Sequence, residues 1–212
     1  FLIILGLIVL TVGFLIPRNN PQVAKAVLPA RFAGVLLLLL GALTASVKQV
    51  DAGEVGVQSL FGKVQPTVLE SGLHVVNPLV DITTFDTKTQ NYTMSGVHDE
   101  GDKVGDDAIR VLTADGLEVI IDLTVLYRVI PTETPGILRQ IGTDYRNKIV
   151  RPITRTKIRD NAVYYDAVSL YSTRRDEFQN RIFKTIEADF KARGLLLEQL
   201  LVRNINLPAS VK

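Results

Sequence analysis

The sequence predicts an α+β protein whose N-terminal end lies in a membrane. The first indication is a pair of uncharged apolar runs, residues 1–16 and 32–47. The second is the alternation of apolar side chains in residues 117–129, which is typical of a half-buried strand. The third is a change to helical spacing after residue 130. We therefore expect, in chain order, a membrane anchor in 1–47, a β-rich part in 48–130, an α/β part in 131–207 and the start of a further helix in 208–212.

The two apolar runs favour membrane insertion because neither is amphipathic, whereas a core helix of a soluble protein normally keeps a polar face. Sixteen helical residues extend about 24 Å, against a hydrocarbon core of about 30 Å. The second run gains length if Arg31 and Lys48 at its ends extend toward the headgroups. A buried core helix, or a signal peptide for the first run, is the alternative. The side chains expected inside the membrane are Leu2, Ile4, Leu7, Leu10, Phe14, Leu36, Leu38, Leu40 and Leu43.

The loop between the two runs, residues 17–31, sets the expected orientation. It contains three bases, three prolines and no acid. If both runs span, the positive-inside rule places this loop in the cytoplasm and the body, from Val50 onward, on the non-cytoplasmic side. Lys48 opposes this orientation weakly, and a re-entrant second run would reverse it. Because the chain begins inside an apolar run and ends without a terminal signal, we expect both ends to continue in a longer protein.

A long strand is the clearest element of the body. Every odd position from Leu117 to Val129 is apolar, and the Asp115–Gly116 pair before it predicts a hairpin turn. Shorter apolar pieces, cut by Gly72 and Pro78, precede it and predict several short strands.

Two helices are expected directly after the long strand. Thr134 should cap the first, which should end at Gly142. The second should cover about residues 144–163, and Pro152 should kink it or shift its start. The side chains that share its apolar face at helical spacing are Tyr145, Ile149, Ile153 and Thr156.

A third helix should begin after Thr173, its expected N-cap, and end at Gly194. Its apolar positions recur every fourth residue, and they are Phe178, Ile182, Ile186 and Phe190. The segment "LLLEQLLVRNINL" then predicts a last strand.

Composition excludes several classes of function. The absence of cysteine excludes disulfides and thiolate chemistry, and two histidines are too few for a His-rich metal site. All 22 acids but only 21 of the 24 bases follow residue 47, so the body is nearly neutral and a global basic footprint for nucleic acid is absent. No G-x-S-x-G, P-loop or G-x-G-x-x-G occurs, and His74 in an apolar stretch is expected to be structural. We expect no catalytic residue, cofactor or metal.

Two charge clusters are candidates for binding. The loop 95–110 could hold Ca²⁺ through its carboxylates, but it lacks the EF-hand spacing, and a solvated acidic loop is the favoured interpretation. The second helix carries six bases and no acid between residues 146 and 159. Its basic face is either solvated or binds an anionic partner such as lipid headgroups or an acidic neighbour.

The body resembles one known family along residues 49–212. The matching stretches, in order, are "VDAGEVGV", "FGKV", "SGLHVVNPLVD", "TADGLEVIIDLTVLYRV", "IGTDYRNKIVRPITRTKIRDNAVYYDAVSLYSTRRDEFQNRI" and "GLLLEQLLVRNINLP". Their order and spacing resemble the band 7, or SPFH, superfamily of stomatin, prohibitin and flotillin, and its bacterial prohibitin-type members most. The second apolar run and the length of loop 95–110 depart from that pattern.

The resemblance implies a β-rich SPFH1 subdomain, an α/β SPFH2 subdomain and a coiled coil that continues beyond Lys212. It implies a non-enzymatic membrane scaffold, in a bacterial inner membrane or a related one. Such a scaffold assembles with itself into a large ring or cage, organises lipids and proteins into a microdomain, and encloses or regulates membrane-bound AAA proteases. The alternatives are a subunit of a membrane protease or hydrolase complex, and a channel component. Nucleic acid is not an expected partner.

A ring would explain two features of the body. The long strand could pair along one edge with the next subunit, or pack its second set of apolar side chains against it. Subunits that meet head to tail also require two complementary patches, so the acidic loop of one subunit is predicted to contact the basic helix of the next. The residues of this predicted contact are Asp99, Glu100, Asp102, Asp106 and Asp107 with Lys148, Arg151, Arg155 and Arg159.

Overall fold

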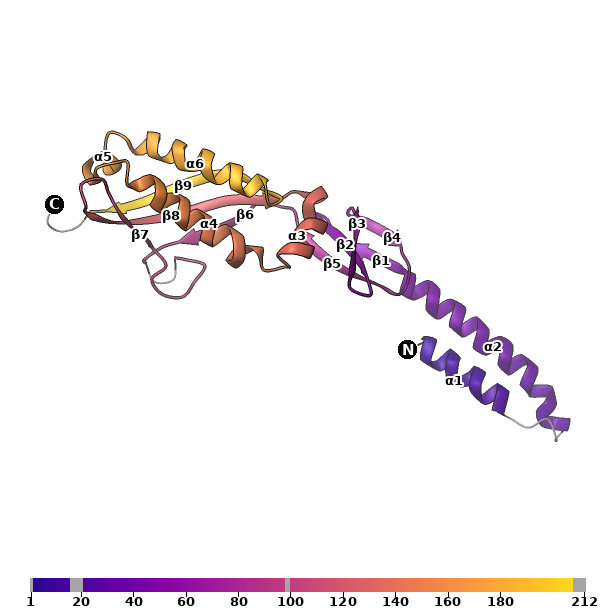
Figure 1. The fold of residues 1–212 in the computed structure, drawn as a ribbon. Coiled ribbons are helices and arrows are strands. Elements are labelled where there is room, and N and C mark those ends of the chain that lie inside the picture. Colours follow the sequence, from indigo (N-terminus) through magenta and orange to yellow (C-terminus); the bar gives the residue numbers. More distant parts are fainter. Residues whose placement is uncertain (1, 16–20, 98–99, 208–212) are drawn as a thin grey trace.

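The chain forms an elongated molecule with a helical hairpin at one end and a sheet covered by helices at the other (Figure 1). The computed structural model describes residues 2–15, 21–97 and 100–207. A smaller group of strands lies between the two ends. The predicted α+β class, with an apolar helical N-terminus, a β-rich part and an α/β part, is confirmed.

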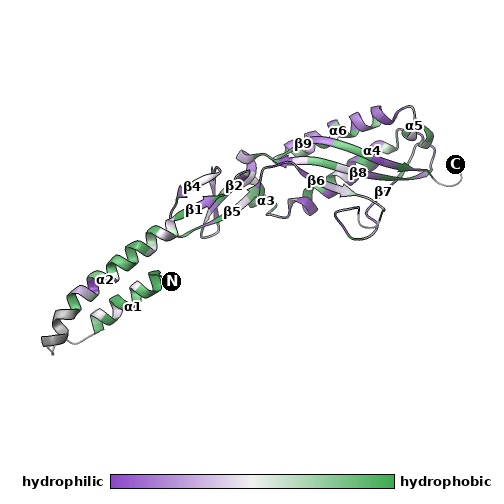
Figure 2. Cartoon of the chain, turned by 180° about the vertical axis from the view of Figure 1, so that it is seen from behind, coloured by the Kyte–Doolittle hydropathy of each residue, from purple (hydrophilic) through white to green (hydrophobic). Residues whose placement is uncertain are grey.

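The helical hairpin consists of α1 (Leu2–Leu15) and α2 (Pro21–Ser46), which run antiparallel (Figure 1). Both are apolar over most of their length (Figure 2). The stretch Val27–Ser46 is long and apolar enough to cross a membrane, whereas α1 is shorter. Glycines allow the close approach: a Cβ on Gly6 would lie 2.9 Å from the Leu38 nitrogen.

The expected basic loop is mostly helical, which corrects its predicted length. Helix α2 begins at Pro21 and continues through Pro29, so within residues 17–31 only 17–20 fall outside the described helices. Proline suits the first turn of a helix because its missing N–H has no intrahelical partner there. A proline inside a membrane helix is also tolerated.

The small β part follows α2 without a linker. Strand β1 (Val47–Val50) pairs with β4 (Gly72–Val75) and forms a two-stranded ribbon. A second sheet has the order β3 (Lys63–Leu69), β2 (Glu54–Leu60) and β5 (Val80–Asp86). The amide of Val76 donates to the carbonyl of Ser46 at 2.8 Å, so the end of the ribbon is joined to the end of α2.

The larger sheet is built around β8 (Glu118–Val129), the predicted long strand. One edge of β8 pairs with β9 (Leu195–Asn206), and the other pairs in turn with β7 (Ile109–Leu112) and β6 (Gln90–Met94). The expectation that β8 offers an edge to another subunit is therefore wrong, because both edges are used within the chain. The strand is long because it serves three partners. This sheet also joins strands from both sides of residue 130.

Helices α4 (Arg151–Ala162) and α6 (Arg175–Lys191) cover one face of this sheet (Figure 1). The predicted apolar face of α6 is fully buried, at Phe178, Ile182, Ile186 and Phe190. Its expected Thr173 cap is wrong, since the N-cap is Arg174 and no side chain caps the helix. Helix α3 (Thr134–Gln140) follows a 3₁₀ turn, η1 (Pro131–Glu133), so Glu133 rather than Thr134 is its N-cap.

The second predicted helix is divided. A π-helical turn, η2 (Arg146–Val150), precedes α4, and Pro152 occupies the first turn of α4, which confirms a shifted start. The extra residue in the π turn rotates the buried face, so Thr156 is exposed. The other predicted positions face the core, since Tyr145 is buried and Ile149 and Ile153 pack against it half-buried. The further buried positions are Val150, Thr154, Ile158, Asn161 and Ala162. A short helix, α5 (Ala167–Tyr171), was not predicted.

Candidate functional site

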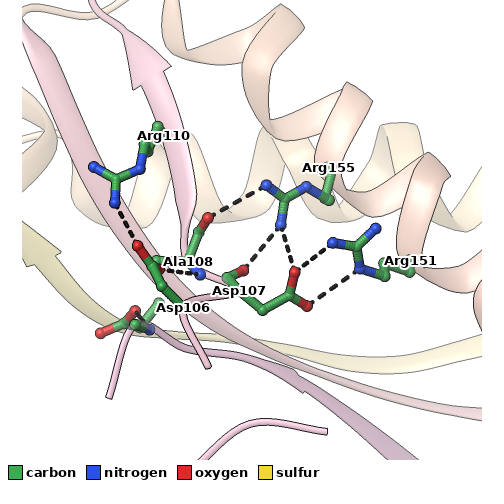
Figure 3. A network of polar contacts seen from close by, with 8 residues as sticks. Asp106, Asp107, Ala108, Arg110, Arg151 and Arg155 are labelled. Carbon is green, nitrogen blue, oxygen red and sulfur yellow. Dashed lines mark hydrogen bonds and ion pairs between the residues drawn. The ribbon is translucent and has the colours of Figure 1, made fainter. Parts of the chain in front are cut away.

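The acidic loop and the basic helix meet within one chain. Asp107 is 4% exposed and lies between two guanidinium groups of α4 (Figure 3). Arg151 donates to both carboxylate oxygens, from Nε at 3.2 Å and from Nη2. Arg155 Nη1 donates to Asp107 Oδ1 at 3.1 Å and to its main-chain oxygen at 2.9 Å. We call Asp107, Arg151 and Arg155 the Asp107 clamp.

A second contact fixes the loop nearer to β6. Arg146 Nη2 donates to Asp102 Oδ1 at 2.6 Å and to the Asn91 carbonyl at 3.0 Å. The other Asp102 oxygen accepts the amide of Thr93 at 2.6 Å. Because Asp102 also donates its own amide to the Thr93 carbonyl at 3.1 Å, the loop lies along the edge of β6.

The π turn explains which bases reach the loop. The amide of Arg151 bonds to the carbonyl of Arg146, five residues earlier, so these two residues lie one above the other. Arg155 follows one α-helical turn later. The sequence placed Lys148 in this row, but Lys148 is exposed and donates to the Ile141 carbonyl at 2.8 Å. The proline at position 152 was the only signal of an irregular start, and it did not indicate a π turn.

The pKa values of the two arginines in the clamp shift in opposite directions, because pairing dominates for one and burial for the other. The hydrogen bond to Asp107 raises the pKa of Arg151, whereas desolvation lowers the pKa of the less exposed Arg155. Both guanidinium groups stay charged at neutral pH, because arginine does not deprotonate in proteins. A carboxylate held by two guanidinium groups is a strong positioning contact.

The exposed carboxylates of the loop make weaker contacts. Asp106 accepts the Ala108 amide at 3.0 Å and pairs with Arg110, and these two donors hold the pKa of Asp106 below its ordinary value (Figure 3). Glu100 lies 3.3 Å from Arg203, with both side chains about two-fifths exposed. Exposed pairs of this kind contribute about 0–1 kcal/mol each.

A buried polar cluster continues from Arg146 into the sheet. The Gln90 amide lies 2.9 Å from the Tyr145 hydroxyl and 3.4 Å from the Tyr127 hydroxyl. Burial raises the pKa of both tyrosines. The guanidinium of Arg146 lies 5.6 Å from the centre of the Tyr92 ring. No sequence pattern indicates this cluster, because Gln90 and Tyr92 precede the π turn by more than fifty residues.

These contacts change the interpretation of the predicted subunit contact. Asp102 and Asp107 have partners in their own chain, so a neighbouring subunit is not needed to explain why the two charge clusters exist. Asp99 lies outside the described residues. Contact between subunits stays a prediction, and the exposed members of the set are Glu100, Asp102, Asp106, Lys148 and Arg159. The favoured picture of a solvated loop is wrong for Asp107, which is buried.

The residues expected in the membrane lie on the hairpin. Ile4, Leu7, Phe14, Leu36, Leu40 and Leu43 are exposed on its surface. Leu2, Leu10 and Leu38 are half-buried, and Leu10 and Leu38 lie where the helices cross close to Gly34 and Gly6. Insertion itself stays a prediction, and a bilayer would cover the exposed leucines that no other part of the described chain covers.

No catalytic chemistry emerges from the described residues 2–15, 21–97 and 100–207. His74 Nε2 lies 2.6 Å from the Glu70 carbonyl oxygen, so it bonds to main chain rather than to a nucleophile. No group of three His, Cys, Asp or Glu side chains in these residues is placed to hold a metal ion. The arrangement can position a loop against a helix, and that is its evident role.

Comparison with known proteins identifies the body. Residues 48–212 match the sequence model described as SPFH domain / Band 7 family. No curated protein matches the chain. The matched segment begins at Lys48, which is the second residue of β1 and lies two residues after the end of α2.

Proposed function

The chain belongs to the SPFH domain / Band 7 family, and on that premise we propose that it is a prohibitin-type membrane scaffold that assembles into a large homo-oligomer. The observation that carries the proposal is the direct succession of an apolar helix and the segment that matches the family: Ser46 ends α2, and Val47 begins β1. A body attached without a linker is held at the bilayer surface in one orientation. Many such bodies side by side would form a wall around a patch of membrane.

The proposed role of this wall is to organise a membrane microdomain and to enclose or regulate membrane proteins such as AAA proteases. The family is generally one of non-enzymatic scaffolds. The Asp107 clamp supports a mechanical role, because its charged groups hold the loop to α4 and leave no free acid or base there. Lipids and further copies of the chain would be the constant partners.

Size after extraction tests the assembly. The full-length protein, extracted in a mild detergent, should elute and sediment as a large homo-oligomer. A stable monomer under conditions that preserve the folded body would contradict the proposal. Labelling of the purified protein by an active-site serine probe would instead favour a hydrolase subunit.

We also propose that the body lies on the non-cytoplasmic side of a bacterial inner membrane or a related one. Helix α2 begins at the end farthest from the body (Figure 1), and its first half contains two of the three bases of residues 17–31, Lys25 and Arg31. The positive-inside rule then directs that end to the cytoplasm. Protease added outside spheroplasts should cleave the body. Cleavage only from the cytoplasmic face would reverse the assignment.

A contact between neighbouring subunits through the remaining exposed charges completes the proposal. Lys148 is exposed in η2 and Arg159 in α4, and Glu100 and Asp106 are exposed in the loop. The double variant Lys148→Glu, Arg159→Glu should make assembly weaker and more salt-sensitive while the body stays folded. Charge reversal of Glu100 and Asp106 in the same protein should restore part of it. Unchanged assembly of the first double variant would end this idea.

A further inference from the structure

The membrane-proximal end of the body carries large apolar side chains that the fold does not cover. Within the described chain, Phe61 is 83% exposed, Val75 79% and Leu73 70%. Leu79 is 61% and Val47 44% exposed. We call these five residues the proximal apolar patch. Exposed apolar groups gathered at one place mark a surface that meets a partner.

We propose that the proximal apolar patch inserts into the interfacial layer of the bilayer, so that the body rests on the membrane through a second contact besides α2. The ligand is the boundary between acyl chains and headgroups. The inference rests on the membrane anchor of the proposed function and is independent of assembly into rings.

The position of the β1–β4 ribbon relative to α2 supports insertion at the depth of the interfacial layer. The twenty residues Val27–Ser46 extend about 30 Å as a helix, which equals the hydrocarbon thickness. Ser46 therefore lies at the edge of the hydrocarbon, and Val47 follows directly, opposite Val75. Leu73 is two residues, or about 7 Å, farther along β4. The headgroup layer on one side is about 5–7 Å thick, so all three side chains fall within it.

The pairing pattern also directs Val47, Leu73 and Val75 to one side. Val75 pairs with Val47, and Leu73 pairs with Gln49. Residues two apart on a strand share a face, and directly paired residues share it too. One face of the ribbon therefore carries three apolar side chains, Val47, Leu73 and Val75, with Gln49 as its one polar member.

The turn at Phe61 lies at the same end. Leu60 is paired with Lys63 on one side and with Val80 on the other, so the turn Phe61–Gly62 extends beyond the end of β5 where the chain arrives from Leu79. Leu79 itself follows an Asn77 turn, in which its amide donates to the Asn77 side chain at 3.0 Å. Two turns with apolar tips thus lie at the start of β5, one on each side of Val80.

Phe61 has a backbone conformation that phenylalanine rarely adopts. Its φ is 49° and that of Gly62 is 82°, which are the values of a type I′ hairpin turn. Asn-Gly is the preferred pair there, and a bulky residue at positive φ is strained. Phe61 is the only non-glycine residue with positive φ among the described residues. A strained and exposed ring is unfavourable in water, and insertion into the membrane interface would offset its exposure.

Charge does not explain the patch. Lys48 and Lys63 flank it, and Asp81 follows Leu79 by two residues, so no strong basic cluster is present. Attraction to anionic lipid needs several bases at the surface. Insertion should therefore depend little on anionic lipid and should occur in neutral vesicles.

Single-cysteine labelling tests the proposal, because residues 1–212 contain no cysteine. The full-length protein, with any cysteine outside this region replaced by serine, would carry Phe61→Cys, Val75→Cys or Leu79→Cys. Each variant would be labelled with an environment-sensitive fluorophore in phosphatidylcholine vesicles. Tyr164→Cys, which is similarly exposed but lies in the covered-sheet half, is the matched control, and Leu36→Cys in α2 reports the anchor.

Headgroup-level spin-labelled lipid should quench the labels at 61, 75 and 79 and leave the label at 164 unchanged, and a deep lipid quencher should act on the label at 36. Equal quenching at 61 and 164 would overturn the proposal. Protection of the patch labels from both lipid quencher and aqueous iodide would also overturn it, since a second copy would then cover the patch. Loss of quenching at 36 would show instead that the membrane anchor of the proposed function fails.

A substitution that preserves the turn gives an independent test. Phe61→Asn suits the type I′ turn and removes the ring, so the body should fold normally. A fluorophore on Leu79→Cys should emit at a shorter wavelength when it enters the membrane interface. With Phe61→Asn in the same protein, part of this blue shift and part of the quenching by lipid should be lost. Unchanged values would overturn a joint insertion of the two turns. Tyr164→Asn is the control and should change neither value.

Discussion

Strands β8 and β4 both carry apolar side chains on alternate residues, and the fold treats them in opposite ways. Along β8, the side chains from Val119 to Val129 that face α4 and α6 have no exposed surface. Along β4, Leu73 and Val75 are more than two-thirds exposed. The difference teaches that alternation in the sequence predicts an apolar face of a strand. What covers that face depends on where the strand lies in the fold. One strand lies beneath helices, and the other lies beside the end of the apolar helix α2.

The largest expected effect concerns the covered half. Phe178 has no exposed surface, and its ring packs edge-on against Tyr165 with 5.5 Å between ring centres. Phe178→Ala should lower the free energy of unfolding by about 3–5 kcal/mol, because it leaves a cavity. Val75→Ala on the ribbon should change it by less than about 0.5 kcal/mol. Denaturant unfolding in detergent measures both, and equal losses would break the comparison.

The second prediction contrasts a buried with an exposed ion pair. Asp107→Ala should cost about 2–3 kcal/mol, since it leaves Arg151 and Arg155 without their shared carboxylate. Glu100→Ala, in the same loop, should cost about 0–1 kcal/mol because its pair with Arg203 is exposed. Limited proteolysis within residues 95–108 should accelerate in the first variant only. Similar cleavage of both variants would mean that the clamp does not hold the loop.

The third prediction sharpens the comparison at the turn of Phe61. Phe61→Asn should raise the free energy of unfolding in detergent by about 1 kcal/mol, because asparagine adopts positive φ more readily. Phe61→Ala removes the same ring but keeps the strain, so it should not stabilise the body. A gain in both variants would indicate that exposure of the ring, rather than its backbone conformation, is the unfavourable feature.

The smallest effect is a local pH dependence. The amide of Ala108 and the guanidinium of Arg110 lower the pKa of Asp106 from 3.8. A carboxylate with a lowered pKa in the fold stabilises it above 3.8 and loses this contribution as the pH falls through the lower value. The protection of the Ala108 amide from hydrogen exchange, measured relative to its intrinsic rate at each pH, should therefore decrease in acid. Asp106→Asn should remove this dependence, and an unchanged acid response in that variant would contradict the assignment.

Local patterns accounted for much of the fold. The spacing of Phe178, Ile182, Ile186 and Phe190 identified the buried face of α6, and the alternation up to Val129 identified β8. Thr156 was misplaced because a π turn adds a residue that no side-chain pattern announces. The clamp was divided between two subunits in the prediction, since the near-neutral body offered no reason for clustering within one chain. Residues 107 and 151 are 44 positions apart, and only the path of β7 across the sheet brings them together.

The sequence by itself determined the apolar anchor, the α+β order of the body and its family, because each depends on composition, short periodicities or motifs in fixed order. Only the tertiary structure decided that both edges of β8 are used, that Asp107 pairs within its own chain, and that Val47, Phe61, Leu73, Val75 and Leu79 gather beside the end of α2. The physical reason is the range of the interactions. Helical and strand periods join residues a few positions apart, whereas pairing registers and ion pairs join residues tens of positions apart.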